Sequence, residues 1–208
     1  MKNIKYKCLR CGNCCKGTMD THESKRIPVY PEEVNKLILL AEKLNLEFKV
    51  IEDLVFPDVK NEKILVLTYR ILMDESRNCC PFFQENFGCL IQNDKPLSCQ
   101  AFPLSFKRVD AFNFQIDIDN KCSFVNKYYD FLKDSNLNDL KEIFPEEFAN
   151  AEKFFQVNKN LQLKITELEY LKKIEIPRKI SLEEYNNYLN NWGREEIKIP
   201  ISNENEKK

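Results

Sequence analysis

Residues 8–15 read CLRCGNCC and place four cysteines within eight positions. Cys8, Cys11 and Cys14 follow one another with two residues between them, so successive sulfurs can turn toward one metal centre, and Gly12 allows the tight bend. Cys15 directly follows Cys14, and adjacent cysteines seldom both bind the same ion. One of this pair therefore serves a second ion or packs inside. The pattern predicts a loop wrapped around a metal, not a helix or a strand.

A second group of cysteines lies farther along the chain, and Cys79 stands beside its first member. The chain from Cys79 to Pro103 holds too many breakers for long regular structure, so it reads as a second metal loop. Two sites of four cysteines with one left over fit this arrangement, as does a single site that draws on both loops. The predicted metal ligands are Cys8, Cys11, Cys14, Cys15, Cys80, Cys89, Cys99 and Cys122.

Length and composition predict a globular protein, since the chain has 208 residues, of which 43% are hydrophobic and 31% charged. We find no apolar run of the roughly 20 residues that cross a bilayer, and no apolar secretory signal, so we expect a cytoplasmic protein. In that reducing compartment nine cysteines are better explained by metal ligands than by disulfides.

The expected fold class is α+β: a small cysteine-rich metal-binding core with a few short strands and covering helices, followed by a mostly helical C-terminal third. We place the metal-binding domain at 1–125, a helical extension packed on it at 126–200 and a disordered tail at 201–208. Apolar periodicity predicts helices at 31–44, from 123, from 145 through the ambiguous stretch 161–170, and at 181–192, where Ser181 and Glu184 form a capping box. Strands are predicted at 64–73 and 112–118, each leading toward a cysteine.

The ligand type narrows the choice of metal. Thiolates select zinc, copper(I) or iron–sulfur clusters and disfavour magnesium and calcium, which need oxygen ligands. His22 is the only histidine, so zinc sites with two or more histidines are excluded and His22 reads as a surface residue. Structural zinc sites usually show two C-x2-C pairs, whereas three cysteines recur here at two-residue intervals. The spacing therefore favours an iron–sulfur cluster over zinc.

Several function classes are disfavoured by what the chain lacks. Four glycines form no glycine-rich loop for a dinucleotide or a nucleoside triphosphate. One histidine makes a poor case for a cysteine hydrolase, which needs a base. The net charge of -1 gives no overall attraction to nucleic acid. Residues 1–26 carry a local surplus of basic side chains, which either offsets thiolate charge or forms a solvated surface.

Four separated blocks together resemble a known family. They are CLRCGNCC at 8–15, CPFF at 80–83, GCLI at 88–91 and KPLSCQAFP at 95–103. In order and approximate spacing they resemble the YkgJ-type cysteine-cluster family, whose members are described as zinc- or iron-chelating domains. The resemblance covers residues 8 to about 122. Lys95 and Gln100 replace arginines common in the family and Gln92 replaces a tyrosine, while every cysteine block is intact.

These observations favour a metal-binding protein in which zinc, iron or an iron–sulfur cluster pins two loops together, with the helical last third facing a protein partner. The resemblance of the cysteine domain to flagellin lysine methylases implies an alternative, an iron–sulfur-dependent redox or protein methyl-transfer enzyme. A metal storage or delivery role is a third option. The sequence assigns no catalytic residue and no oligomeric state.

Overall fold

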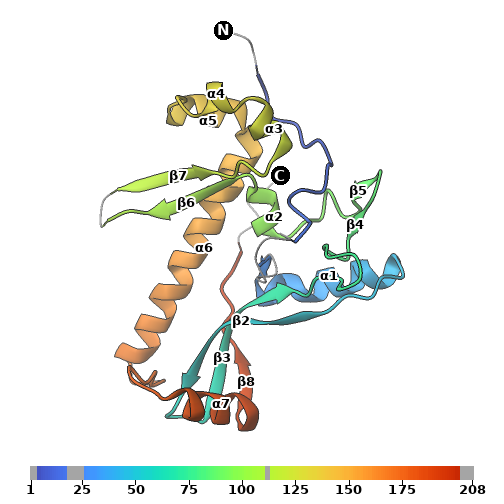
Figure 1. Ribbon diagram of the computed structural model, residues 1–208. Coiled ribbons are helices and arrows are strands. Elements are labelled where there is room, and N and C mark those ends of the chain that lie inside the picture. The colour runs from blue at the N-terminus through green and yellow to red at the C-terminus, as the bar shows by residue number, and fades with distance from the viewer. Residues whose placement is uncertain (1–3, 18–25, 111–112, 202–208) are drawn as a thin grey trace, which may run out of the picture.

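The computed structural model describes residues 4–17, 26–110 and 113–201 and has an α+β architecture (Figure 1). The strands form small, mainly antiparallel sheets, and a long helix dominates the C-terminal part. The predicted fold class is therefore confirmed. The predictions for His22 and for the tail beyond residue 201 lie outside the described residues.

Strand β3 (Lys63–Ile71) is the centre of the largest sheet. It pairs antiparallel with β1 (Pro28–Val29) and β2 (Val50–Asp58), and in parallel with β8 (Gly193–Glu196). Most of its side chains are buried, as expected for a strand with neighbours on both edges. The strand predicted at 64–73 is confirmed as β3.

Three strands of this sheet were absent from the sequence prediction, namely the two-residue β1 and the longer β2 and β8. In β2 the pairing with β3 shifts register between Glu52 and Leu54 and again between Leu54 and Val55. Such irregularities break the alternation of apolar and polar residues by which a strand is recognised in sequence. The residues of β8 are all exposed and none is hydrophobic, so the strand carries no apolar signal.

Helix α1 (Pro31–Lys43) confirms the helix predicted at 31–44. Its buried face includes Leu37 and Ala41, as expected, and Leu40 packs partly against the same core. Ile38, by contrast, is 38% exposed, although the sequence pattern placed it on the buried face. The apolar stripe is therefore rotated slightly from the predicted one.

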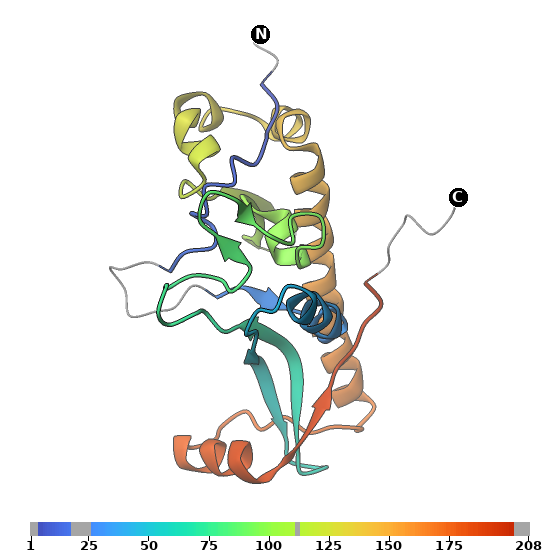
Figure 2. The same ribbon diagram turned by 90° about the vertical axis from the view of Figure 1, so that its right-hand side faces the viewer.

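Helix α6 (Pro145–Tyr170) is the longest helix in the described part of the chain. It runs from the α3–α5 group to the β2–β3–β8 sheet (Figures 1 and 2). Its inner face packs on the sheet through Val157, Leu161 and Ile165, which share a buried cluster with Leu65 and Leu67 of β3. The helix predicted from 145, including the ambiguous stretch to Tyr170, is confirmed. The domain division at residue 125 stays a prediction.

The remaining elements are short. The capping box of Ser181 and Glu184 is confirmed at the start of α7. None of the helices among the described residues is long and apolar enough to cross a membrane. The other bounds are β4 (Phe83–Gln84), β5 (Gly88–Cys89), α2 (Leu97–Ala101), β6 (Leu104–Arg108), β7 (Phe114–Ile118), α3 (Ser123–Lys127), α4 (Tyr129–Leu132), α5 (Leu137–Ile143) and α7 (Leu182–Asn191).

The N-terminal cysteine loop is held against the second cysteine loop by backbone hydrogen bonds. The N–H of Cys80 donates to the carbonyl of Cys15 at 2.7 Å, and the N–H of Gly17 donates to the carbonyl of Asn78 at 2.9 Å. No helix or strand forms within residues 4–17, as predicted. Main-chain pairing thus brings together two stretches of chain that are more than 60 residues apart.

Two glycines allow the loops to approach this closely. Gly12 and Gly88 both have a φ of 80°, which residues with a side chain rarely adopt. A Cβ atom at Gly12 would lie 2.2 Å from Cε2 of Phe83, and one at Gly88 would lie 2.5 Å from Cβ of Arg10. Each glycine lies in one loop and its contact lies in the other, so both loops are shaped for this interface.

A half-buried carboxylate fixes the helix that carries Cys99. Glu33, in the first turn of α1, accepts hydrogen bonds from the N–H of Tyr30 at 3.0 Å and from the N–H of Leu97 at 2.7 Å. Leu97 begins α2, so this side chain joins the N-terminal ends of two helices. Burial raises the pKa of Glu33, and the two N–H donors counteract part of that effect.

Replacing Gly12 by alanine should weaken the contact between the two cysteine loops. The new Cβ would overlap the ring of Phe83, which is only 5% exposed, and would strain a left-handed backbone. We expect a loss of about 2–4 kcal/mol in the free energy of unfolding, measured by urea denaturation. Gly193→Ala is the matched control, because nothing lies within 4 Å of its added Cβ. Equal stability of the two variants would contradict this account.

The pH dependence of stability should reveal the raised pKa of Glu33. Its folded-state pKa lies above the ordinary value of 4.5, so the folded protein holds this proton more tightly than the unfolded chain. The free energy of unfolding of the wild type, relative to Glu33→Gln, should therefore fall as the pH rises above 4.5 and level off beyond the folded-state pKa. Urea titrations from about pH 4 to about pH 8 measure this difference, and a constant difference would contradict it.

Candidate metal centre

Eight cysteines line one cavity of about 180 Å³. They come from the N-terminal loop, the second cysteine loop, helix α2 and the residue that precedes α3. The structure therefore brings together all eight predicted ligands, although their assignment as ligands stays a prediction. They are Cys8, Cys11, Cys14, Cys15, Cys80, Cys89, Cys99 and Cys122.

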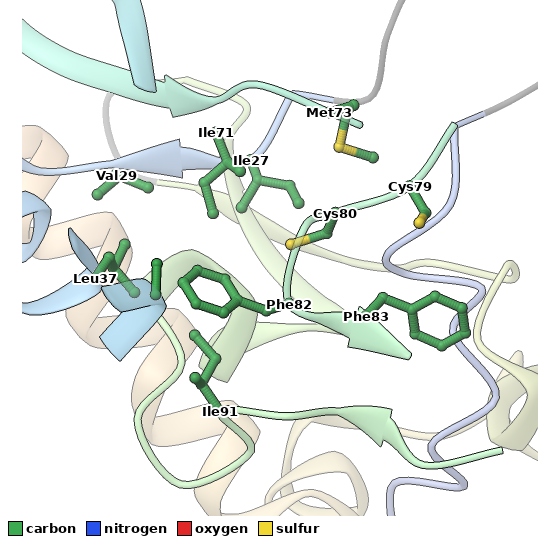
Figure 3. Packing of buried hydrophobic residues seen from close by; sticks show 11 residues of the cluster. Ile27, Val29, Leu37, Ile71, Met73, Cys79, Cys80, Phe82, Phe83 and Ile91 are labelled. Carbon is green, nitrogen blue, oxygen red and sulfur yellow. The ribbon is translucent and has the colours of Figure 1, made fainter. Parts of the chain in front are cut away.

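Cys79 and Cys80 are neighbours in different surroundings. Both are buried, but only Cys80 lines the cavity. Figure 3 shows the side chain of Cys80 directed toward Ile27 and Ile71, and that of Cys79 directed away from them. The backbone of Cys79 forms an antiparallel bridge with Lys16 of the N-terminal loop. Cys79 therefore belongs to the contact between the loops and not to the cavity wall.

The eight cysteine side chains surround the cavity without converging on one point. Among the described residues, no three His, Cys, Asp or Glu side chains stand together as the ligands of one metal ion. Metal binding would therefore draw the sulfurs inward. The main chains of the two loops are already held together by hydrogen bonds.

Four of these cysteines share one local geometry. In each, the sulfur accepts a hydrogen bond from the backbone N–H of the residue two positions later. These N–H groups stabilise the thiolate over the thiol, and such bonds to sulfur tune metal–thiolate centres. The donors are Asn13 to Cys11, Phe82 to Cys80, Ile91 to Cys89 and Phe124 to Cys122.

Burial and the proximity of other thiols have the opposite effect, since they raise the pKa of most of the cavity thiols. Desolvation raises the pKa of Cys80 to about 12, and neighbouring thiols add to the effect. The pKa of Cys99 is raised by desolvation and by the thiols of Cys80, Cys14 and Cys89. Without a cation, these buried sulfurs are therefore protonated at neutral pH. Metal binding there must displace protons.

Cys11 differs from these buried thiols. Desolvation would raise its pKa, but hydrogen bonds from the Ser123 hydroxyl and from the N–H groups of Asn13 and Ser123 outweigh it and lower the pKa. The Ser123 Oγ lies 3.2 Å from the sulfur of Cys11. Asn13 Nδ2 in turn donates to Ser123 Oγ at 3.1 Å and to the carbonyl of Lys121, also at 3.1 Å. The exposed Cys11 thus lies in a small polar network.

The charged side chains that line the cavity are all basic. Arg10, Arg26 and Lys95 contribute to the lining, and no described Asp or Glu does. Burial raises the pKa of both Cys89 and Cys99, and the charge of Lys95 offsets a small part of that rise. A metal centre with four thiolates carries net negative charge, which these cations would offset. The basic surplus predicted around the first cysteines thus has a counterpart at the cavity.

Three polar residues of the site were not identified from the sequence. Tyr6 hydrogen-bonds through its hydroxyl to the sulfur of Cys122, and Asn13 and Ser123 support Cys11. Each lies within two positions of a cavity cysteine in the sequence, which is the only signal the chain offers. Tyrosine, asparagine and serine are common on any surface, so proximity in sequence alone does not single them out.

Comparison with known protein families agrees with a metal site made of these cysteines. Residues 7–127, more than half of the chain, match the model of the CxxCxxCC family, described as a "putative zinc- or iron-chelating domain". Searches of curated proteins and of solved structures gave no significant match. The match spans every cavity cysteine from Cys8 to Cys122. The chain therefore belongs to the CxxCxxCC family of zinc- or iron-chelating domains.

Proposed function

We propose that this protein binds a resident metal centre in the eight-cysteine cavity, and that this centre is an iron–sulfur cluster in preference to a zinc ion. The observation that carries the proposal is the gathering of eight cysteines from separate stretches of chain around one cavity. In a reducing compartment, soft thiolate donors in this number fit a soft metal better than they fit disulfides.

The size and composition of the cavity support a cluster. Roughly 10–15 Å³ of such space holds one water molecule, and a bare zinc ion needs no more. A cavity of about 180 Å³ has room for a group of several atoms. The described lining contains no histidine, whereas catalytic zinc sites commonly use several.

The protein would contribute three kinds of group to the metal centre. The cysteines would hold the metal, the N–H groups two positions later would support the thiolates, and the basic side chains would offset their charge. An iron–sulfur cluster supplies electron transfer, and either metal supplies a cross-link between the two cysteine loops. We propose the cross-link as its first role, because the ligands come from both loops.

Purification under anaerobic conditions tests the proposal directly. A brown protein that absorbs in the visible and contains iron and acid-labile sulfide in comparable amounts is the expected result. A colourless protein with stoichiometric zinc would exclude the cluster and keep the metal site. A protein purified without any metal, and unable to take up iron or zinc when reduced, would refute the metal centre.

Two adjacent cysteines offer a matched pair of variants. Cys80→Ser removes a sulfur from the cavity wall, whereas Cys79→Ser changes a buried cysteine of the same loop that does not line the cavity. We expect the metal content of Cys80→Ser to fall about tenfold or more, and that of Cys79→Ser to stay near the wild type. Elemental analysis measures both, and circular dichroism checks that each variant folds. Equal loss of metal from both variants would argue against the cavity as the site.

A further inference from the structure

The chain contains two pairs of adjacent cysteines, and the two pairs are arranged differently. The backbone of Cys79 forms antiparallel bridges with Lys16 and Asp74, so this pair lies in extended chain. Successive side chains of extended chain point to opposite sides. Accordingly, Figure 3 shows the sulfurs of Cys79 and Cys80 directed apart, and of the two only Cys80 lines the cavity.

The other pair, Cys14 and Cys15, lies in a turn. The N–H groups of Cys15 and Lys16 donate to the carbonyl of Gly12 at 2.7 Å and 3.0 Å. The two side chains lie on the same side of this turn, and their sulfurs are 3.6 Å apart, within hydrogen-bonding distance. Both cysteines are half-buried, in the reduced thiol form, and line the cavity. Two sulfurs are therefore in contact within the candidate metal centre.

A disulfide between these two sulfurs would be easy to reach and strained. An S–S bond is about 2.0 Å long, so the sulfurs would have to approach by roughly 1.5 Å. Adjacent Cα atoms are about 3.8 Å apart, whereas most disulfides join Cα atoms about 4.4–6.8 Å apart. Strain makes a disulfide easier to reduce, and strained disulfides are the labile and regulatory ones. Such a bond suits a reversible modification and not a permanent cross-link.

The main chain around this pair does not depend on the thiols. The carbonyl of Cys15 accepts the hydrogen bond from the N–H of Cys80 at 2.7 Å, and the N–H of Cys15 donates to Gly12. Neither bond involves a side chain. Joining the two sulfurs would therefore leave the contact between the cysteine loops in place and would alter the cavity wall.

We propose that Cys14 and Cys15 are a site of reversible oxidation, at which hydrogen peroxide joins the two sulfurs in a disulfide and a dithiol reductant separates them again. The two thiols lose their protons and two electrons as the S–S bond forms, while the O–O bond of the peroxide breaks and two water molecules are released. The dithiol reverses the change by exchange and becomes a disulfide itself. A disulfide sulfur is not a thiolate ligand, so oxidation lowers the metal capacity of the cavity. That consequence rests on the proposed function.

Peptide mapping tests the bond itself. The purified protein is treated with a stoichiometric amount of hydrogen peroxide, its remaining thiols are alkylated, and it is digested with trypsin. Cys14 and Cys15 are released together in the peptide 11–16. We expect this peptide to carry one alkyl group, on Cys11, and a disulfide between its other two cysteines. Treatment with dithiothreitol before alkylation should restore three alkylated cysteines.

Two controls make the result specific. Cys79 and Cys80, released in the peptide 78–107, should form no bond with each other, because their sulfurs are directed apart. The variant Cys15→Ser should yield no disulfide in the shorter peptide. A bond within the Cys79 and Cys80 pair that forms as readily would refute the proposal. A disulfide from Cys14 to any other cysteine, or oxidation to sulfinic acid without a bond, would refute it as well.

Metal uptake separates this inference from the proposed function. The oxidised and the reduced protein are incubated with Zn²⁺, passed through a gel-filtration column and subjected to elemental analysis. The disulfide leaves fewer of the cavity thiols for sets of four ligands, so the oxidised protein should hold at most about half the metal of the reduced one. Equal metal content would refute the effect of oxidation on the metal. A reduced protein that binds no metal would refute the proposed function, whereas the mapped disulfide would stand.

Discussion

The metal site depends first on the main-chain contact between two cysteine loops. The hydrogen bonds from Cys80 to Cys15 and from Gly17 to Asn78 involve no side chain, so they do not depend on the protonation state of any thiol. Gly12 and Gly88 make the contact possible because neither presents a Cβ to the opposite loop. Three of the four glycines of the chain lie at this interface, which explains their clustering in the first half of the sequence.

A second constraint is electrostatic. Burial and mutual proximity favour protonated thiols, as the raised pKa values of Cys80 and Cys99 show, while metal binding requires thiolates. Two features of the fold favour the thiolate form locally: N–H donors at four sulfurs and the positive charge of Lys95. These groups do not cancel the effect of burial on the pKa of Cys80 and Cys99, and a bound cation would complete the compensation there. Cys11, whose donors do outweigh burial, needs that compensation least.

The sequence predicts the chemistry of this site better than its geometry. Cysteine spacing identifies the two loops, and apolar periodicity identifies α1, β3 and α6, because those elements bury regular stripes. Strand β2 was missed because its register shifts break the alternation, and β8 because it is exposed. The role of Tyr6 was missed because it depends on how Cys122 packs, and no local pattern encodes a contact between residues so far apart.

The separation of the ligands along the chain decides how metal binding and folding are coupled. In small zinc modules the ligands are close in sequence, and the metal supplies most of the folding energy. Here β3, β6 and β7 lie between Cys8 and Cys122 in the sequence, and Cys99 lies in a helix whose first residue is hydrogen-bonded to Glu33 of α1. The buried cluster formed by α6 and β3 contains no cavity cysteine, whereas the other two clusters contain Cys80 and Cys122. One part of the core therefore packs without any cavity cysteine, so metal binding would stabilise mainly the two clusters that contain cysteines and the loops beside them.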